Sequence, residues 1–168
     1  MKARDLDSER SLAVCESLGA EARGVLNQRD TYFRVPRGRL KLREEARATA
    51  QLIAYERSDL AEQRESDYRI VAVEDAEGLK VALAAALGVS VTVAKERRLF
   101  IWEGVRIHLD RVEGLGHFLE FEAVTGEGAL DLAAAEKRVE ELRRAFGLEA
   151  DQLVGESYCD LAPADPNA

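Results

Sequence analysis

Hydrophobic and polar residues alternate with two different periods along the 168-residue chain. Apolar residues at every second position predict a β-strand, whereas apolar residues three and four positions apart predict a helix with one apolar face. Helical spacing occurs in three segments, which are Asp7–Leu18, Asp75–Leu87 and Leu130–Phe146. The strand pattern occurs in about seven segments, which are Val25–Val35, Arg39–Glu45, Ala50–Arg57, Ser66–Val73, Val89–Trp102, Val105–Val112 and Phe118–Thr125.

Short connections separate most of the predicted strands. Pro36–Gly38 and Glu103–Gly104 are turn sequences, and the polar segment Ser58–Glu65 is typical of a loop. Strands joined by tight turns pair antiparallel as a meander, and this many strands can curl into a barrel. We therefore predict an α+β fold in which an antiparallel β-barrel carries helices packed on its outside. No internal repeat or linker interrupts residues 1–162, so we expect a single domain, followed by a disordered tail over residues 163–168.

Composition and charge exclude several classes of function. The chain is 46% hydrophobic and 33% charged, which is typical of a soluble globular protein. Its formal net charge of −8 argues against a general nucleic-acid binder, because phosphate backbones bind basic surfaces. No apolar run approaches the ~20 residues that a membrane-spanning helix needs, and Met1–Asp5 carries no apolar signal sequence. Cys15 and Cys159 fit no disulfide or metal-ligand pattern, so we expect a cytoplasmic protein with reduced thiols.

Charged residues are sorted by strand. Arg39, Lys41 and Arg43 lie two positions apart and share one face of their predicted strand, while Leu40 and Leu42 share the other. The same alternation groups Lys95 with Arg97, Arg106 with His108 and Asp110, and Glu120 with Glu122. One interpretation is the solvated face of a half-exposed antiparallel sheet. We favour charged faces inside a curled sheet, because a merely solvated face would mix the signs of charge and the helices need the apolar faces.

Such an interior indicates a polyanionic ligand. Arginine and lysine side chains that line a closed sheet repel one another and lose hydration, and a bound polyanion relieves both costs. The arginine fork matches phosphate oxygens, and Mg²⁺ commonly binds one or two carboxylates together with substrate phosphates. Cations for a phosphate chain, together with carboxylates for a metal, predict a site for phosphoryl or nucleotidyl transfer.

Six sequence strings carry a resemblance to a known family. They are D-T-Y-F-R-V-P-R-G-R-L-K-L-R-E from Asp30, A-Y-E-R-S-D from Ala54, S-D-Y-R from Ser66, V-R-I-H-L-D from Val105, G-L-G-H-F-L-E-F-E from Gly114 and S-Y-C-D-L from Ser157. In order and spacing they resemble the CYTH family across nearly the whole chain. The resemblance is to its class IV adenylyl cyclase branch, and thiamine triphosphatases belong to the same family.

The resemblance implies a triphosphate tunnel, which is a closed or nearly closed antiparallel barrel of about eight strands. Members of the family bind triphosphate-containing substrates, usually with Mg²⁺ or Mn²⁺. They cyclise ATP to cyclic AMP, or they hydrolyse thiamine triphosphate, inorganic triphosphate or nucleoside triphosphates. We therefore expect a triphosphate-containing small molecule as the binding partner, no nucleic acid or membrane, and a homodimer as in this branch. No base-reading motif identifies the triphosphate.

The resemblance also implies roles for individual residues. The residues expected to bind phosphates are Arg39, Lys41, Arg43, Arg57, Arg69, Lys95, Arg97 and Arg106. Glu120 and Glu122 are expected to bind the metal, and the residues expected to act in catalysis are Lys2, Asp110 and Arg106. His108 is a candidate acid or base, but a structural role is expected for it. Tyr158, with Ser157, belongs to a family-like tail that is a candidate for closing the tunnel mouth.

The chain departs from the family at its first strand. The family signature there is E-x-E-x-K, in which two glutamates bind metal and the lysine contacts substrate. Here Lys2 stands at the position of the lysine, and the two glutamates are missing. Either the recorded start lies a few residues too late, which we favour, or the first strand is truncated and metal binding relies on Glu120 and Glu122. The sequence thus predicts a metal-dependent cyclase or triphosphatase, with a non-catalytic polyphosphate- or nucleotide-binding module as the alternative.

Overall fold

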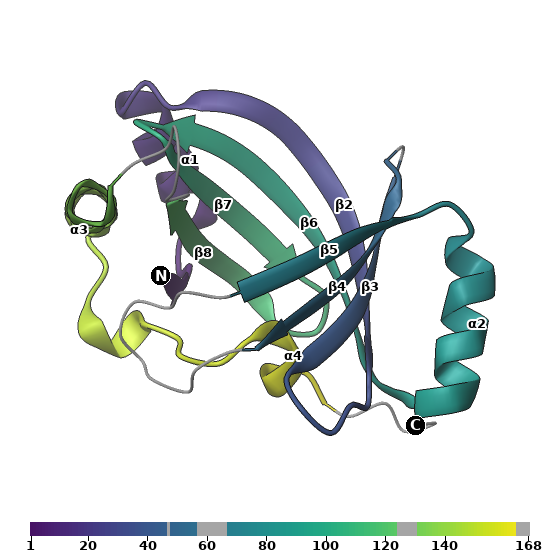
Figure 1. Ribbon diagram of the computed structural model, residues 1–168. Helices are drawn as coiled ribbons and strands as arrows, with labels where there is room; N and C mark the ends of the chain where they lie inside the picture. Colours follow the sequence, from purple (N-terminus) through teal and green to yellow (C-terminus); the bar gives the residue numbers. More distant parts are fainter. Residues whose placement is uncertain (47, 57–66, 124–130, 164–168) are drawn as a thin grey trace. The chain divides into compact units, whose positions relative to one another are not determined.

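The computed structural model describes residues 1–46, 48–56, 67–123 and 131–163 (Figure 1). In these residues, eight strands form one antiparallel sheet in the order β1-β8-β7-β6-β2-β3-β4-β5. The strands are β1 (Lys2–Arg4), β2 (Glu21–Phe33), β3 (Arg39–Glu45), β4 (Ala50–Glu56), β5 (Asp67–Val73), β6 (Val89–Trp102), β7 (Val105–Val112) and β8 (Gly116–Ala123). The helices are α1 (Ser8–Ser17), α2 (Ala76–Leu87), α3 (Leu132–Phe146), α4 (Tyr158–Leu161) and the 3₁₀-helix η1 (Ala150–Gln152). The predicted α+β class is confirmed.

The sheet is open in the described part of the chain, with β1 at one edge and β5 at the other. It also differs from a single meander. β2 to β5 pair in sequence order, and so do β6 to β8, but α2 separates the two runs and β6 pairs with β2. β1 pairs with β8, where Lys2 lies opposite Glu120. Alternation alone does not predict this order, because it fixes the faces of a strand and not its neighbours.

Most predicted elements occur within a few residues of their expected bounds. β3, β6 and β7 match the predicted segments at both ends. β2 begins at Glu21, four residues before the predicted Val25, and the hydrophobic pattern does not predict the three residues of β1. The predicted loop Ser58–Glu65 falls outside the described residues.

The chain forms two compact units. The first contains Met1–Leu26 and Glu96–Gly155, and the second contains Asn27–Lys95 and Glu156–Ala168. The single domain expected over residues 1–162 stays a prediction. So does the disordered tail, of which residues 164–168 lie outside the described ranges. No helix in the described ranges is long and apolar enough to cross a membrane.

The core of the first unit brings β7 and β8 together with α1 and α3. Leu109, Leu119 and Phe121 are buried, and they belong to one cluster with residues of both helices. The rings of Phe121 and Phe146 lie at a tilt, with 5.2 Å between their centroids. The apolar positions predicted on β7 and β8 therefore form the core, and the alternate positions carry the charged groups.

The core of the second unit brings β3 together with α2. Leu42 is fully buried and clusters with Phe33, and the apolar face of α2 packs against them through residues that include Leu79 and Leu83. Because side chains alternate along a strand, packing Leu42 into this core directs its neighbours Lys41 and Arg43 to the opposite face of β3.

Aspartate begins each of the three long helices. Asp7, Asp75 and Asp131 each accept a hydrogen bond from the backbone N–H group three residues later. This contact satisfies one of the donors that a helix leaves without an intrahelical partner. α3 ends at Phe146 and is capped by Gly147, whose φ of 64° lies in the left-handed region that favours glycine.

Candidate functional site

Three cations follow one another on β3, as the sequence predicts. Arg39, Lys41 and Arg43 occupy alternate positions. In the β2–β3 pair, Lys41 lies opposite Tyr32 and Arg43 lies opposite Asp30. Directly opposite residues share a face of an antiparallel pair. The face that carries the cations therefore also carries a carboxylate and a phenol from β2.

Asp30 binds two of these cations. Lys41 Nζ donates to Asp30 Oδ2 at 2.9 Å, and Arg43 donates through Nε and Nη2 to the two carboxylate oxygens at 2.7 Å each. Asp30 and Lys41 are both buried, with 2% and 8% of their surface exposed. Lys95 of β6 is buried as well, and its charge acts on Asp30. We call Asp30, Lys41, Arg43 and Lys95 the Asp30 cluster.

Opposing effects set the pKa of Asp30. Burial removes water from the carboxylate and raises its pKa, whereas the charges of Lys41, Arg43 and Lys95 lower it. The cations prevail, so the pKa lies well below its ordinary value and Asp30 is ionised at neutral pH. The charges of Lys41, Arg43 and Lys95 thus act together on one buried carboxylate.

Tyrosine rings lie beside both lysines of the cluster. Lys41 Nζ lies 5.4 Å from the centre of the Tyr32 ring and 5.9 Å from that of Tyr55. Lys95 Nζ lies 5.1 Å from the centre of the Tyr158 ring. A cation is attracted to an aromatic face within ~6 Å of its centre. The rings therefore stabilise the lysines as cations in surroundings that contain little water.

Arg39 contacts the short helix α4. Its Nη1 donates to Ser157 Oγ at 2.7 Å, and its Nη2 donates to the two carboxylate oxygens of Asp160 at 2.9 and 2.8 Å. Ser157 and Asp160 also cap α4 reciprocally, each side chain accepting a backbone N–H of the other. The S-Y-C-D-L segment thus binds the first cation of the β3 row.

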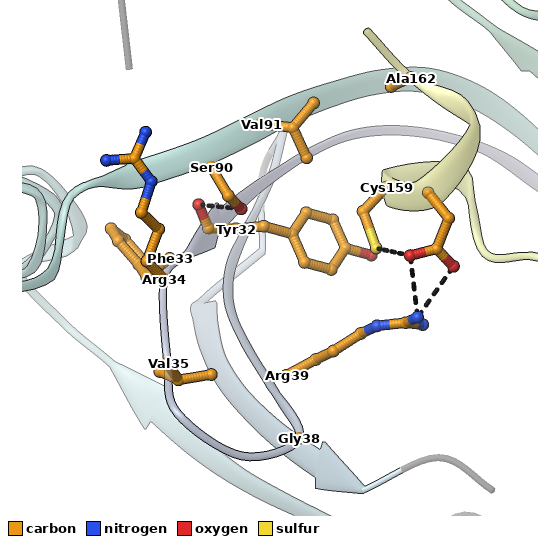
Figure 2. A pocket seen from close by; sticks show the side chains of 11 residues that line it. Tyr32, Phe33, Arg34, Val35, Gly38, Arg39, Ser90, Val91, Cys159 and Ala162 are labelled. Carbon is orange, nitrogen blue, oxygen red and sulfur yellow. Dashed lines mark hydrogen bonds and ion pairs between the residues drawn. The ribbon is translucent and has the colours of Figure 1, made fainter. Parts of the chain in front are cut away.

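An open pocket lies at this end of β3 (Figure 2). Its volume of about 440 Å³ is typical of small-molecule sites. Its lining combines apolar or aromatic side chains with charged groups and a thiol. The apolar and aromatic residues are Tyr32, Phe33, Val35 and Val91, and the others include Arg34, Arg39, Cys159 and Asp160.

A second group of charged residues lies in the first unit. Arg97 of β6 donates to both oxygens of Asp110, through Nε at 2.7 Å and Nη2 at 2.6 Å. The same Nη2 donates to Glu120 Oε2 at 2.6 Å. The side chain of Asp110 is fully buried, and 9% of that of Arg97 is exposed. Asp110 therefore fixes the position of Arg97.

Glu120 and Glu122 converge on His108. Glu120 Oε2 lies 3.5 Å from His108 Nδ1, and Glu122 Oε2 lies 4.0 Å from His108 Nε2. Neither separation is that of a good hydrogen bond, and within the described residues Nδ1 is buried without a hydrogen-bond partner. Arg106 Nη1 donates to Glu122 Oε2 at 3.2 Å. The imidazole therefore stands between two carboxylates.

These surroundings keep Glu120 charged and His108 neutral. Burial raises the pKa of Glu120, but Arg97, His108 and Lys2 together lower it more, so the pKa lies well below its ordinary value. Burial also lowers the pKa of His108, as does Arg97, although Glu120 opposes them. At neutral pH the histidine is therefore uncharged, and Arg97 with Lys2 supplies the positive charge around Glu120.

Glu120 and Glu122 fit the protein's share of a Mg²⁺ or Mn²⁺ site. Their Oε2 atoms approach one imidazole, so both offer hard oxygen ligands in the same neighbourhood. In the part of the chain that the structure describes, no group of three His, Cys, Asp or Glu side chains is placed to hold a metal. A metal would therefore also need phosphate and water ligands, as Mg²⁺ does in many phosphate-transfer sites.

The structure places the remaining predicted site residues less centrally. Arg69 is exposed on β5, and the side chain of Arg106 is 48% exposed on β7. Arg57 lies outside the described residues. Asp30 and Asp160 are functional candidates that the sequence prediction misses. Alternation with Tyr32 could have identified Asp30, whereas no local pattern indicates Asp160, which binds a residue 121 positions away.

Comparison with known proteins gives the family to which this chain belongs. The family model of the CYTH domain matches residues 1–155, so the chain belongs to the CYTH domain family. This confirms the resemblance that the six sequence strings predict. No curated protein matches the chain.

Solved structures agree with this fold. The chain is similar to the PH1012 protein of Pyrococcus horikoshii OT3, with 25% identity, a TM-score of 0.84 and coverage of 96% of this chain and 97% of that chain. A conserved hypothetical protein of Pyrococcus furiosus has 22% identity, a TM-score of 0.82 and coverage of 96% and 100%. A candidate adenylate cyclase of Vibrio parahaemolyticus has 21% identity, a TM-score of 0.73 and coverage of 96% and 94%. The last two likenesses concern the fold alone.

Proposed function

We propose that this CYTH protein binds a triphosphate through Arg39 and the Asp30 cluster. The observation that carries the proposal is the meeting of three cations at one buried carboxylate. The charges of Lys41, Arg43 and Lys95 act together at Asp30, and positive charges gathered at one place attract a polyanion. Arg39 and Arg43 present planar forks that match phosphate oxygens, and the two lysines supply point charges.

We further propose a metal-dependent enzyme of the cytoplasm, either a class IV adenylyl cyclase-like enzyme or a triphosphatase. Membership of the CYTH domain family supports this proposal. Glu120 and Glu122 would hold Mg²⁺ or Mn²⁺, which when bound neutralises negative charge on the reacting phosphate. Lys2 and Arg97 supply positive charge beside these carboxylates, and Asp110 keeps Arg97 in place.

Two reactions fit this assignment. In a cyclase, the ribose 3′ hydroxyl attacks the α-phosphate, loses its proton and displaces pyrophosphate. In a hydrolase, water attacks the terminal phosphate and displaces the rest of the chain. Both reactions build negative charge on phosphate oxygens, and positioned arginine and lysine side chains stabilise that charge.

A non-catalytic module that binds polyphosphate or a nucleotide is the second candidate. The contacts that arginine side chains make with Glu120 and Glu122 favour this second candidate. Arg97 binds Glu120 at 2.6 Å, and Arg106 binds Glu122 at 3.2 Å. Each carboxylate must therefore share or release its arginine before it binds a metal.

Lys41→Ala tests the binding half of the proposal. The variant is expected to bind inorganic triphosphate about tenfold or more weakly by titration calorimetry, because it loses a charge-assisted contact. Arg144→Ala is the matched control, since the Arg144 side chain is 76% exposed on α3. The control should bind as the wild type does. If Lys41→Ala bound inorganic triphosphate as tightly as the wild type does, the proposal that the β3 cations bind the phosphates would be contradicted.

Glu122→Gln tests the catalytic half. Turnover of ATP or inorganic triphosphate with Mg²⁺ or Mn²⁺ is expected to disappear, while the affinity for triphosphate is retained, because the amide keeps the shape of the side chain but is a poor metal ligand. Equal loss of binding in Glu122→Gln and Lys41→Ala would contradict the division of roles. Binding without turnover in the wild type would instead favour the second candidate.

A further inference from the structure

Helix α2 is apolar on the side that faces solvent as well as on the side that faces the core. Leu79 and Leu83 pack into the core of the second unit. A surface helix normally carries polar residues on its outer side, and a helix that is apolar all round is normally buried. Val81 alone leaves 60% of its surface exposed. The exposed residues of α2 after its first turn are Val81, Ala82, Ala85 and Ala86.

Helix α3 shows the ordinary pattern for comparison. Glu136, Lys137 and Arg144 are exposed on it, and they keep its outer side hydrated. In α2, by contrast, no charged residue follows Lys80. The outer side of α2 therefore offers a continuous apolar surface to a partner.

The N-terminal end of α2 is acidic. Glu44, Glu45 and Glu74 line an open pocket of about 660 Å³ there, together with Ala76 of the helix itself. Lys80 Nζ pairs with Glu44 Oε1 at 3.1 Å, and Glu74 is exposed. Among the described residues at this end, carboxylates therefore outnumber cations.

The C-terminal end of α2 is basic. The backbone N–H group of Arg34 donates to the carbonyl oxygen of Gly88, the residue that follows α2, at 3.1 Å. A Cβ atom at Gly88 would lie 3.1 Å from Arg34 Nη1, so the guanidinium group lies against this end of the helix. Arg34 is exposed and points away from Arg39 (Figure 2), and Arg37 is exposed in the next turn.

We propose that the outer side of α2 packs against α2 of a second copy of this chain, with the two helices antiparallel about a two-fold axis. Such an axis brings the N-terminal end of each helix to the C-terminal end of its partner. The 12 residues of α2 span about 18 Å, so Glu74 of one copy would meet Arg34 of the other while the apolar residues meet at the centre.

The charge pattern favours a second copy over an unrelated partner. A surface used in a two-fold dimer must be complementary to itself after rotation. An apolar centre between one acidic and one basic end meets this condition, because each end then faces the opposite charge. Triphosphate plays no part in this pairing, which is therefore independent of the proposed function.

A weak dimer is expected from a helix of this length. Stable interfaces commonly bury ~800 Å² of each partner, and one helix of three turns supplies only part of that area. Sedimentation equilibrium of the full chain without triphosphate, from about 1 μM to about 1 mM, covers the range in which such a dimer forms and dissociates.

Ala82→Arg tests the apolar centre. The two-fold axis would bring two arginines into an apolar contact, so the Kd of the dimer should rise at least about tenfold. Ala133→Arg is the matched control, because Ala133 is exposed on α3, and it should self-associate as the wild type does. A wild type that stays monomeric over the whole range, or an Ala82→Arg variant that associates as strongly as the wild type, would overturn the proposal.

Exchanging the charges at the two ends tests the antiparallel arrangement. Glu74→Arg alone and Arg34→Glu alone each bring like charges together, so each should raise the Kd of the dimer about tenfold. The double variant restores opposite charges, and its Kd should return to within about threefold of the wild type. A general loss of structure would not be repaired by a second substitution. A double variant as weak as the two single variants would overturn the antiparallel pairing.

Discussion

Asp30 is the residue on which the cations of the second unit depend. It is 2% exposed and accepts three hydrogen bonds from Lys41 and Arg43. Without this carboxylate, Lys41 and Arg43 would each lose a buried ion-pair partner. Asp30 also uses donors that a phosphate would use, so a bound phosphate must share Lys41 and Arg43 with it.

Asp30→Asn is therefore expected to lower the free energy of unfolding by about 3–5 kcal/mol, the usual cost of breaking a buried ion pair from one side. Urea denaturation measures the change. Inorganic triphosphate should return part of the lost stability, because it replaces the missing negative charge. Asp151→Asn is the control, since Asp151 is exposed on η1. Equal stability of Asp30→Asn and the wild type would show that the cluster does not need this charge.

The same residue contributes to stability at acid pH. The pKa of Asp30 in the folded protein lies below the ~3.9 of an unfolded chain. The contribution is therefore present above about pH 4 and is lost as the pH falls toward the folded pKa. The Asp30→Asn variant lacks this titration, so its free energy of unfolding should fall less steeply than that of the wild type between about pH 5 and pH 3.

At the scale of elements, the aspartate caps define where the helices begin. Asp75→Ala is expected to lower the free energy of unfolding by about 1 kcal/mol, because the Gly78 N–H group loses its acceptor. Glu77→Ala in the same first turn is the matched control. The Glu77 side chain is 73% exposed and pairs only at the surface with Lys80, so a change within about 0.5 kcal/mol is expected. Urea denaturation of both variants checks the difference, and equal losses would contradict a capping role.

The sequence predicts strands well where one face of the strand packs against apolar residues. β3, β6 and β7 are such strands, and their predicted bounds match the structure. β2 begins with exposed residues from Glu21 onward, so its first half has no apolar face and shows no alternation. α4 has four residues, and a helical period cannot be recognised over so short a segment.

The candidate site is predictable within a strand and less so between strands. The shared face of Arg39, Lys41 and Arg43 follows directly from alternation. The partners of these cations depend on register and on distant segments. Asp30 reaches Arg43 through the β2–β3 register, and Asp160 reaches Arg39 from the end of the chain. A single sequence does not reveal these pairs between distant residues, because neither the strand register nor the position of the last segment follows from alternation.

At the scale of the whole molecule, an acidic protein carries a local site for anions. The net charge is −8, yet three cations meet at Asp30. A triphosphate that binds only the folded protein should raise the free energy of unfolding by ~2.7 kcal/mol at a concentration of one hundred times Kd. Thermal unfolding with and without inorganic triphosphate, each with and without Mg²⁺, measures this effect. An unchanged midpoint at saturating triphosphate would contradict binding to the folded chain.

The division into two compact units has an optical consequence. Trp102, the one tryptophan of the sequence, packs against the core of the first unit. All four tyrosines belong to the second unit, and they are Tyr32, Tyr55, Tyr68 and Tyr158. Tryptophan fluorescence therefore reports the first unit, and tyrosine absorbance reports mainly the second. β2 and β6 contribute residues to both units. If the two optical signals change at the same temperature on heating, these long strands make the chain unfold as one cooperative unit. If the two signals change at different temperatures, each unit unfolds by itself.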